Sequence, residues 1–296
     1  MKSSSPLSVR QLTRQTNDFT LGPIDLELDS GFTYALLGPN GSGKTTFMKC
    51  CMNLLQPTSG ELQIFGRIYA DEEDDIKEQI AFVPVALEGC EPFTLQNMGT
   101  LIHGGYKAWN DSDFRQRAEL FQVPLDKPYG RMSEGQRRKT ALTLALSTRA
   151  PLLLLDEPTN GLDIVSRNRL KEMLLHDQEA MSRTILMATH SIEDIRQFAD
   201  YIFVIKHGKV IGPFEKDELM ASWGRIWIAP DWQTNRHDQP IDFQQVPGIV
   251  EWVEQPYPHI ITEDRNSTHT YLKQKQIEVV NEQPLALDEL LERLLQ

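Results

Sequence analysis

No stretch of this sequence is apolar for long enough to cross a lipid bilayer. A membrane-spanning helix needs about 20 apolar residues in a row, and the N-terminal segment MKSSSPLSVR also lacks the apolar core of a signal peptide. We therefore expect a chain that stays in the cytoplasm unless another chain holds it at a membrane.

Cysteine and positive charge are also scarce. The three cysteines, Cys50, Cys51 and Cys90, have no metal-ligand spacing, so we expect reduced thiols that serve as small apolar side chains. The 30 basic residues are outnumbered by 42 acidic ones, which gives a net charge of −12. Because a protein that follows a phosphate backbone usually carries a basic stripe, we predict no nucleic-acid partner.

The length and composition are those of a globular protein with a substantial core. The 296 residues predict one large or two ordinary domains, and 40% of them are apolar. Over the first 220 residues, short apolar runs alternate with helical patterns, which predicts an α/β fold with parallel strands. The clearest predicted strands are residues 34–37, 80–83, 152–155, 184–188 and 201–205.

The pattern turns helical between residues 92 and 147, with predicted helices near 95–103, 114–121 and 133–147. This segment is either a helical subdomain inserted between strands or a helical layer of the same domain. From residue 221 onward the chain is rich in Trp and Pro. That change predicts a first domain over residues 1–220 and a small α+β accessory domain over residues 221–296.

Local patterns near the two ends of the chain predict further elements. Residues 9–28 are predicted as two strands broken by Gly22-Pro23, and residues 61–69 as another strand. The acidic cluster at residues 71–75 has no ligand pattern, so we predict a solvated loop rather than a cation site. In the tail, the predicted elements are strands at 226–228 and 271–280 and an amphipathic helix at 285–294.

A glycine-rich loop, GPNGSGKTT, joins the predicted strand at 34–37 to a helix that starts near residue 47. Its glycines let several backbone N–H donors approach a polyphosphate, and the helix start adds its positive dipole end. Lys44 is placed for the β- and γ-phosphates and the Thr45 hydroxyl for Mg²⁺, so we expect a nucleoside triphosphate as ligand. Phe19 either stacks on the base or is an ordinary strand side chain. The predicted phosphate-binding residues are Gly38, Pro39, Asn40, Gly41, Ser42, Gly43, Lys44, Thr45 and Thr46.

Polar residues follow two of the later strands at the edge of the sheet where ligands collect. Asp156 and Glu157 come directly after the run LLLL. Asp156 is predicted to hold Mg²⁺ through water, and Glu157 to polarise the attacking water. His190 follows the strand at 184–188 and is predicted to hydrogen-bond the γ-phosphate.

A second anion site is predicted where the sequence MSEGQ opens the helix at 133–147. Ser133 is its predicted N-cap, and the backbone donors of the first turn are the anion-binding groups. One nucleotide hardly needs two such sites. Ser191 and Asp194 fit a capping box for a helix that begins at Ile192, so we interpret these two residues as structural.

The order of these motifs resembles that of the ATP-binding subunits of ABC transporters. GPNGSGKTT resembles the Walker A motif, SEGQ the signature, LLLLDEP the Walker B motif, and Asn160-Gly161-Leu162-Asp163 the D-loop, while His190 resembles the switch histidine. The resemblance covers residues 7–215. It implies an ABC-type ATPase of the P-loop class that uses ATP and Mg²⁺.

The family also implies partners. Two ATP-binding domains pair head to tail, which implies a homodimer or a pair with a second ATP-binding subunit. Ser133, Gly135 and Gln136 would then contact the γ-phosphate bound by the partner, and Asp163 would link the two sites. A membrane permease on a separate chain would hold this protein at the cytoplasmic face of the membrane.

The phosphate loop and the tail from Gln283 to Leu290 are most similar to those of subunits that serve bacterial ABC-2-type export permeases. Two other interpretations stay open. One is a soluble ABC-type ATPase that acts on a macromolecular assembly, and the other is a nucleotide-binding regulator with little turnover.

Three positions depart from the family pattern. Met132 and Glu134 replace a Leu and a Gly of the signature, and both are tolerable at a helix start. Val85 stands where the family has the Q-loop glutamine. Either Glu88 substitutes for that glutamine, or the predicted metal ligands hold the ion with an extra water; we favour the second.

Overall fold

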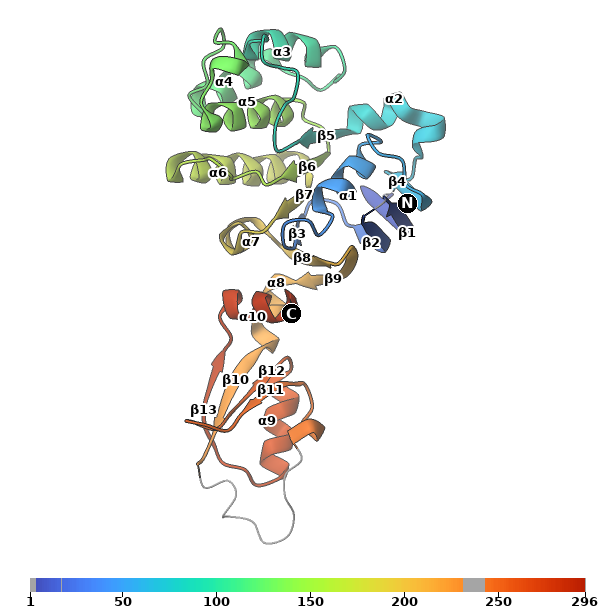
Figure 1. The fold of residues 1–296 in the computed structure, drawn as a ribbon. Helices are drawn as coiled ribbons and strands as arrows, with labels where there is room; N and C mark the ends of the chain where they lie inside the picture. The colour runs from blue at the N-terminus through green and yellow to red at the C-terminus, as the bar shows by residue number, and fades with distance from the viewer. Residues whose placement is uncertain (1–3, 17, 231–242, 296) are drawn as a thin grey trace. The chain divides into compact units, whose positions relative to one another are not determined.

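The computed structural model describes residues 4–16, 18–230 and 243–295 (Figure 1). The chain forms two compact units, Met1–Pro213 and Phe214–Gln296. The predicted domain boundary at residue 220 and the predicted helical subdomain at about 92–147 stay predictions.

The first unit contains a six-stranded sheet in the order β5-β6-β7-β3-β8-β9. The neighbouring pairs from β5 to β8 are all parallel, which confirms the predicted α/β fold. Every residue of β3, β6 and β7 is buried, as expected for apolar strands that are covered on both faces. The bounds are β3 Thr33–Leu37, β5 Ile80–Val83, β6 Leu152–Asp156, β7 Thr184–Thr189, β8 Tyr201–Lys206 and β9 Lys209–Glu215.

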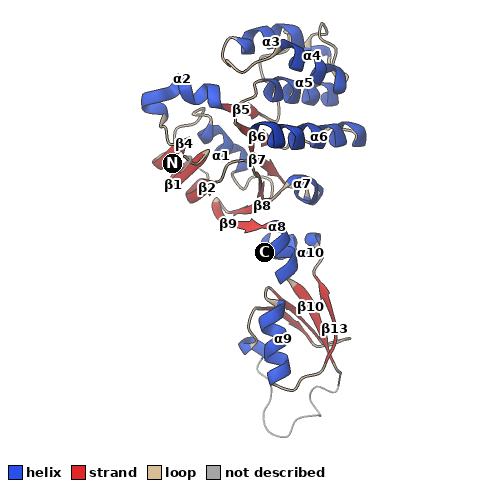
Figure 2. Ribbon diagram, turned by 180° about the vertical axis from the view of Figure 1, so that it is seen from behind, coloured by secondary structure: helices blue, strands red, loops and turns tan. Residues whose placement is uncertain are grey.

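Alternate residues of β6 point to opposite faces of this sheet. Leu152 and Leu154 join the core that contains residues of α1 (Lys44–Cys51), whereas Leu153 and Leu155 join the core that contains residues of α6 (Ile164–Met181). Figures 1 and 2 show α1 and α6 on opposite sides of β6. The strand that carries Asp156 at its end is therefore fixed from both sides.

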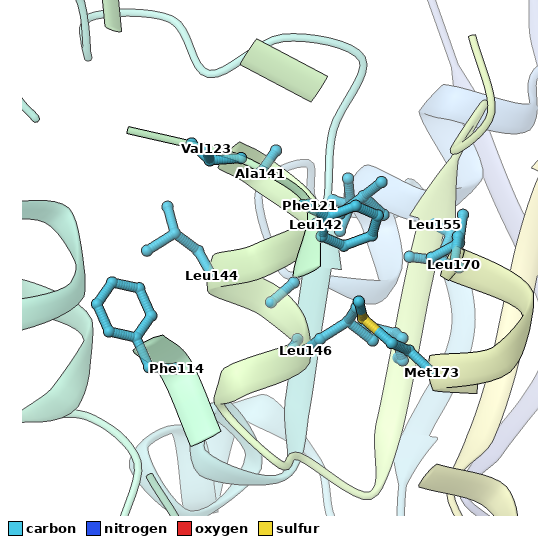
Figure 3. Close-up of a cluster of buried hydrophobic side chains, with 14 of the residues drawn as sticks. Phe114, Phe121, Val123, Ala141, Leu142, Leu144, Leu146, Leu155, Leu170 and Met173 are labelled. Carbon is cyan, nitrogen blue, oxygen red and sulfur yellow. The ribbon is translucent and has the colours of Figure 1, made fainter. Parts of the chain in front are cut away.

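Helices α3, α4 and α5 share their hydrophobic core with the sheet. Figure 3 shows Phe114 of α4 and Leu142 of α5 in a cluster that continues to Leu155 and Met173. The three predicted helices in this segment are confirmed, with small shifts at their ends. The bounds are α3 Leu95–His103, α4 Asp111–Leu120, a 3₁₀ turn at Tyr129–Arg131, and α5 Glu134–Ser147.

Two further helices of this unit flank β7. The predicted helix beginning at Ile192 is confirmed as α7 (Ile192–Phe198). The sequence pattern does not predict α6, because Ile164, Val165 and Leu175 are exposed and interrupt its apolar periodicity.

The remaining strands of the first unit form an antiparallel sheet in the order β2-β1-β4, with bounds Thr20–Leu28, Leu7–Gln15 and Ser59–Ile64. The predicted break at Gly22-Pro23 is wrong, because this pair lies inside β2. Gly22 serves close packing instead: its φ is +101°, and a Cβ there would lie 2.1 Å from the carbonyl oxygen of Leu12.

The acidic cluster at residues 71–75 lies in a helix and not in a loop. α2 spans Tyr69–Gln79, and the strand predicted over 61–69 ends at Ile64. Carboxylates in the first turn of a helix are favoured by its dipole, and Ile76 is buried on the inner side. The acidic side chains of the cluster are exposed, as predicted.

The second unit contains an antiparallel sheet in the order β11-β12-β10-β13, and Leu272 of α9 packs into the core with Ile226 and Ile260 of that sheet. The predicted strand at 226–228 and helix at 285–294 are confirmed. The strand predicted at 271–280 is wrong, because its first residues belong to α9, which Asp264 caps. The bounds are α8 Lys216–Ser222, β10 Gly224–Ile228, a 3₁₀ turn at Phe243–Gln245, β11 Ile249–Val253, β12 His259–Thr262, α9 Arg265–Gln274, β13 Val279–Pro284 and α10 Leu287–Leu295.

Within the described part of the chain, no helix has both the length and the apolar character that a bilayer span requires.

Candidate nucleotide site

The strand register brings three predicted site segments to one edge of the six-stranded sheet. Leu37 at the end of β3 pairs with Thr189 at the end of β7, and Asp156 at the end of β6 pairs with the residue before Thr189. The phosphate loop, Glu157 and His190 each follow one of these strand ends. They therefore gather at the carboxyl edge, where α/β sheets bind ligands.

The phosphate loop combines a left-handed glycine with a buried lysine. Gly43 precedes α1 with φ +108°, and a Cβ there would lie 2.7 Å from a side-chain carbon of Leu21. No side chain caps α1, so the N–H groups of its first turn remain available as donors. Lys44 Nζ donates to the carbonyl oxygens of Gly38 at 2.7 Å and Pro39 at 3.2 Å. Burial lowers the pKa of Lys44 from its usual value.

The two predicted Mg²⁺ ligands, Thr45 and Asp156, are in contact. Thr45 Oγ1 donates to Asp156 Oδ2 at 2.7 Å, and the other carboxylate oxygen of Asp156 is buried with no protein partner. Burial raises the pKa of Asp156. Among the described residues, no group of three or more His, Cys, Asp or Glu side chains could hold a metal by itself. One hydroxyl and one carboxylate fit Mg²⁺, which usually completes its shell with phosphate oxygens and water.

Glu157 and His190 form a pair beside Lys44. Glu157 Oε1 lies 2.9 Å from His190 Nδ1 and 3.7 Å from Lys44 Nζ, while Oε2 is buried without a protein partner. The φ of Glu157 is +51°, a left-handed conformation that costs a non-glycine residue about 1–3 kcal/mol and persists only where the surroundings impose it. A carboxylate held in this way can orient a water molecule and accept its proton.

A cleft of about 350 Å³ is bounded by residues from all of these segments. Phe19 lines this cleft next to Gly43 and also packs against the hydrophobic core, so its position suits either predicted role. Asn160 lines the cleft too, a position that its place in the D-loop motif does not predict. The lining residues are Phe19, Asn40, Gly41, Gly43, Lys44, Thr45, Thr46, Val85, Glu157, Asn160 and His190.

Several predicted residues do not line the cleft. Gly38 and Pro39 bind the lysine through their carbonyl oxygens, as described above, and Ser42 is buried in the loop. A Cβ at Gly38 would lie 2.4 Å from the carbonyl oxygen of Ile205, so this position requires close backbone packing. Asp156 is 1% exposed.

The signature residues lie at the start of α5 and do not line the cleft either. Ser133 Oγ accepts from the Gln136 N–H at 3.3 Å, and Gln136 Oε1 accepts from the Ser133 N–H at 3.2 Å, which together make a capping box. Gly135 lies against the D-loop, since a Cβ there would be 2.8 Å from the Gly161 carbonyl oxygen.

Asp163 is the N-cap of α6. It accepts from the Ser166 N–H at 2.8 Å and from Lys139 Nζ at 3.2 Å. The hydrogen bonds from Ser166 hold the pKa of Asp163 well below its usual range. Its carboxylate is thus ionised, and it lies largely exposed beside Lys139 of α5.

The capping box predicted for Ser191 and Asp194 is only half right. Ser191 Oγ accepts from the Asp194 N–H, but the Asp194 carboxylate accepts from the hydroxyls of Thr159, at 2.7 and 2.8 Å, and Thr189, at 3.0 Å. Asp194 is buried, and burial raises its pKa. It connects the segment after Glu157 to the end of β7, a role that sequence spacing does not reveal.

Val85 is 59% exposed and lines both the cleft and a second cavity of about 610 Å³. Glu88 lines the second cavity and is not among the residues of the cleft. The structure therefore gives no support to the hypothesis that Glu88 replaces the missing glutamine.

A glycine loop, a Thr–Asp pair and a Glu–His pair around one cleft define a P-loop nucleotide-binding protein. The family model for ABC transporters matches residues 21–160. The energy-coupling factor transporter ATP-binding protein EcfA2 of Ligilactobacillus salivarius is 30% identical over 241 residues, which are 77% of this chain and 80% of that protein. The chain belongs to the ABC transporter family, as one of its ATP-binding proteins.

Other relatives agree with this assignment. The ABC transporter ATP-binding protein YtrB of Bacillus subtilis is 24% identical over 286 residues, or 96% of both chains. The daunorubicin/doxorubicin resistance ATP-binding protein DrrA of Streptomyces peucetius is 33% identical over 68% of this chain and 62% of its own length.

Solved structures share the fold. An ATP-binding subunit of an ABC transporter has a TM-score of 0.67 at 24% identity, over 73% of this chain and 92% of that one. The ATP-binding cassette MJ0796, described as a dimer with ADP and Pi, has a TM-score of 0.60 at 24% identity, over 71% and 98%.

Proposed function

We propose that this chain is the ATP-hydrolysing subunit of a transporter and that it drives a separately encoded membrane permease. The observation that carries the proposal is the Glu157–His190 pair at 2.9 Å, beside the phosphate-loop Lys44 and the contact between Thr45 and Asp156. This arrangement places groups that can bind phosphate, groups that can bind a metal ion and a carboxylate that can orient the attacking water around a single cleft.

Each side chain has one task in the proposed reaction. Lys44 and the first N–H groups of α1 bind the β- and γ-phosphates of ATP. Thr45 and Asp156 would hold Mg²⁺, which would supply positive charge beside the phosphates. Glu157 orients the attacking water and accepts its proton, and His190 holds the Glu157 carboxylate in place and donates to the γ-phosphate.

The proposed active form is a homodimer or a pair with a second ATP-binding subunit. Ser133, Gly135 and Gln136 would complete the site of the partner by binding its γ-phosphate, and Asp163 would link the two sites. Two facts support this arrangement: the start of α5 does not line the cleft of its own chain, and MJ0796 is described as a dimer with ADP and Pi.

A permease would hold this chain at the cytoplasmic face of the membrane. Export through an ABC-2-type permease is supported by the similarity to DrrA, which is named as a drug-resistance protein, and by the phosphate loop and tail described above. The acidic net charge supports a function without nucleic acid.

A second candidate is a nucleotide-binding regulator with little turnover. Val85 favours it, because an apolar side chain lines the cleft where the family has a glutamine. Phosphate release separates the two candidates. We expect the purified chain to release phosphate from ATP only with Mg²⁺, and to co-purify from detergent-solubilised membranes with a membrane permease. Tight ATP binding without phosphate release would favour the regulator and contradict the ATPase.

A further inference from the structure

Arg138 is a buried cation whose hydrogen bonds reach two separate segments of the nucleotide site. It lies in the second turn of α5 and is 5% exposed. Its Nη1 donates to the Pro84 carbonyl oxygen at 2.5 Å and its Nε to that of Pro158 at 3.2 Å, while Nη2 donates to the carbonyl oxygens of Asp156 and Glu157. One guanidinium thus binds the backbone on both sides of Glu157 and the residue before Val85.

These bonds bear directly on the conformation of Glu157. Its left-handed backbone needs support from its surroundings. The Glu157 N–H donates to the Ala188 carbonyl oxygen at 2.8 Å, and the Glu157 carbonyl oxygen accepts from the Asn160 N–H at 3.2 Å and from Arg138. The planar fork of an arginine is suited to several carbonyls at once, which a lysine ammonium cannot match in geometry.

The same helix carries the signature residues. Ser133 caps α5 five residues before Arg138, and Gln136 lies two residues before it. A helix of this length moves as a rigid element. A displacement of the α5 start would therefore reach the carbonyl groups beside Glu157 through Arg138. Asp156 and Glu157 also attract the guanidinium electrostatically, which opposes the cost of its burial.

We propose that Arg138 is a positioning residue that couples the N-terminus of α5 to the backbone of Glu157. This inference rests on the proposed function, because the coupling acts on ATP hydrolysis. When the α5 start meets the nucleotide of a second subunit, Arg138 sets the position of Glu157 in its own cleft. Each subunit thereby senses the nucleotide bound by the other.

Arg137 offers a matched control on the same helix. Its guanidinium donates to the carbonyl oxygens of Tyr129 at 3.1 Å and Gly130 at 2.7 Å and lies over the Tyr129 ring. These contacts stay within the helical segment, away from Glu157. Arg137→Met removes a guanidinium of equal size and charge without touching the carbonyl groups around the catalytic carboxylate.

The test compares the full-length wild type with Arg138→Lys, Arg138→Met and Arg137→Met. Circular dichroism melts report folding, equilibrium binding gives the Kd for Mg²⁺-ATP, and phosphate release against ATP concentration gives kcat, KM and the Hill coefficient. We expect kcat to fall on the order of 10-fold in Arg138→Lys and 10²-fold in Arg138→Met. The Kd should stay within about 2-fold and the Hill coefficient should approach about 1, while Arg137→Met retains the wild-type kcat.

The outcomes separate this inference from the proposed function. A wild type that releases no phosphate contradicts the proposed function itself. An active wild type whose Arg138 variants lose no more kcat than Arg137→Met overturns only the positioning role. Loss of the folded state in both Arg138 variants also overturns it, because the guanidinium would then be a scaffold element.

Discussion

Helices α1 and α5 both begin at a motif predicted to bind an anion, but the polar groups of their first turns are satisfied in different ways. α1 follows Gly43 without a side-chain cap, and its first residue, Lys44, brings an ammonium. The N-terminus of α5 is capped by side chains, because Ser133 and Gln136 exchange hydrogen bonds in a capping box. The first N–H groups of a helix have no partner within the helix. α1 therefore offers free donors and a cation, whereas one such donor of α5 is already occupied.

This difference bears on which of the two helix starts could bind a polyphosphate without a partner. The α1 start can hold a polyphosphate by itself, while at the α5 start the Gln136 N–H could bind a phosphate oxygen only by leaving Ser133 Oγ. A side-chain cap is worth about 0.5–2 kcal/mol, a cost that a charged phosphate presented by another subunit can offset. The comparison agrees with the proposal that α5 completes the site of a partner.

The largest effect is expected from removing the cation of α1. Lys44→Ala should lower ATP hydrolysis by on the order of 10² to 10³, because a charge that stabilises the transferring phosphate is lost. Lys49→Ala is the matched control, since Lys49 is exposed on the last turn of the same helix. Phosphate release and binding of a fluorescent ATP analogue measure both. A Lys44→Ala protein as active as the control would contradict the assignment of α1 as the phosphate-binding helix.

A bulky substitution at the start of α5 sharpens the comparison. Ser133→Arg should leave ATP affinity unchanged, because α1 is untouched, but lower hydrolysis by about 10², as expected when phosphate-binding groups are lost. Mixing Ser133→Arg with Lys44→Ala should restore part of the activity, since the mixed dimer contains one intact composite site. Titrating one variant into the other while following phosphate release checks this. Full activity of Ser133→Arg alone would refute the arrangement in trans.

The smallest effect is expected at Val85, beside the cleft. Val85→Gln should raise the Mg²⁺ affinity or the basal ATPase rate a few-fold, because the new amide adds a polar group beside the predicted Mg²⁺ ligands. If Val85 instead packs against the permease, the same variant should co-purify less permease from membranes. Mg²⁺ titrations of phosphate release and pull-downs distinguish these results. No change in either quantity would mean that Val85 is a neutral departure.

The sequence predicts those parts of the site that depend on local chain order. A strand, a glycine loop and a helix are contiguous in the phosphate motif, so Lys44 and Thr45 can be placed from spacing alone. The contact between Thr45 and Asp156 joins distant segments. It was still predictable, because parallel strands bring their carboxyl ends to the same edge of a sheet.

Other features depend on packing that no local pattern records. Arg138 and Asp194 look like ordinary charged residues of helices, and only the fold buries them against carbonyl or hydroxyl groups of distant segments. The wrongly predicted secondary-structure elements have a similar origin. Gly22-Pro23 lies within a strand because Gly22 packs against Leu12, and α9 forms where a strand was predicted because Asp264 caps it.

The most direct test of the account is the Glu157→Gln variant with Mg²⁺ and ATP. If Glu157 orients the attacking water, this variant should bind ATP like the wild type and hydrolyse it slower by on the order of 10² or more. ATP would then persist between the α1 start of one subunit and the α5 start of the other, so size-exclusion chromatography should show a stable ATP-dependent dimer. A variant that stays monomeric with ATP, or that hydrolyses ATP at the wild-type rate, would contradict the account.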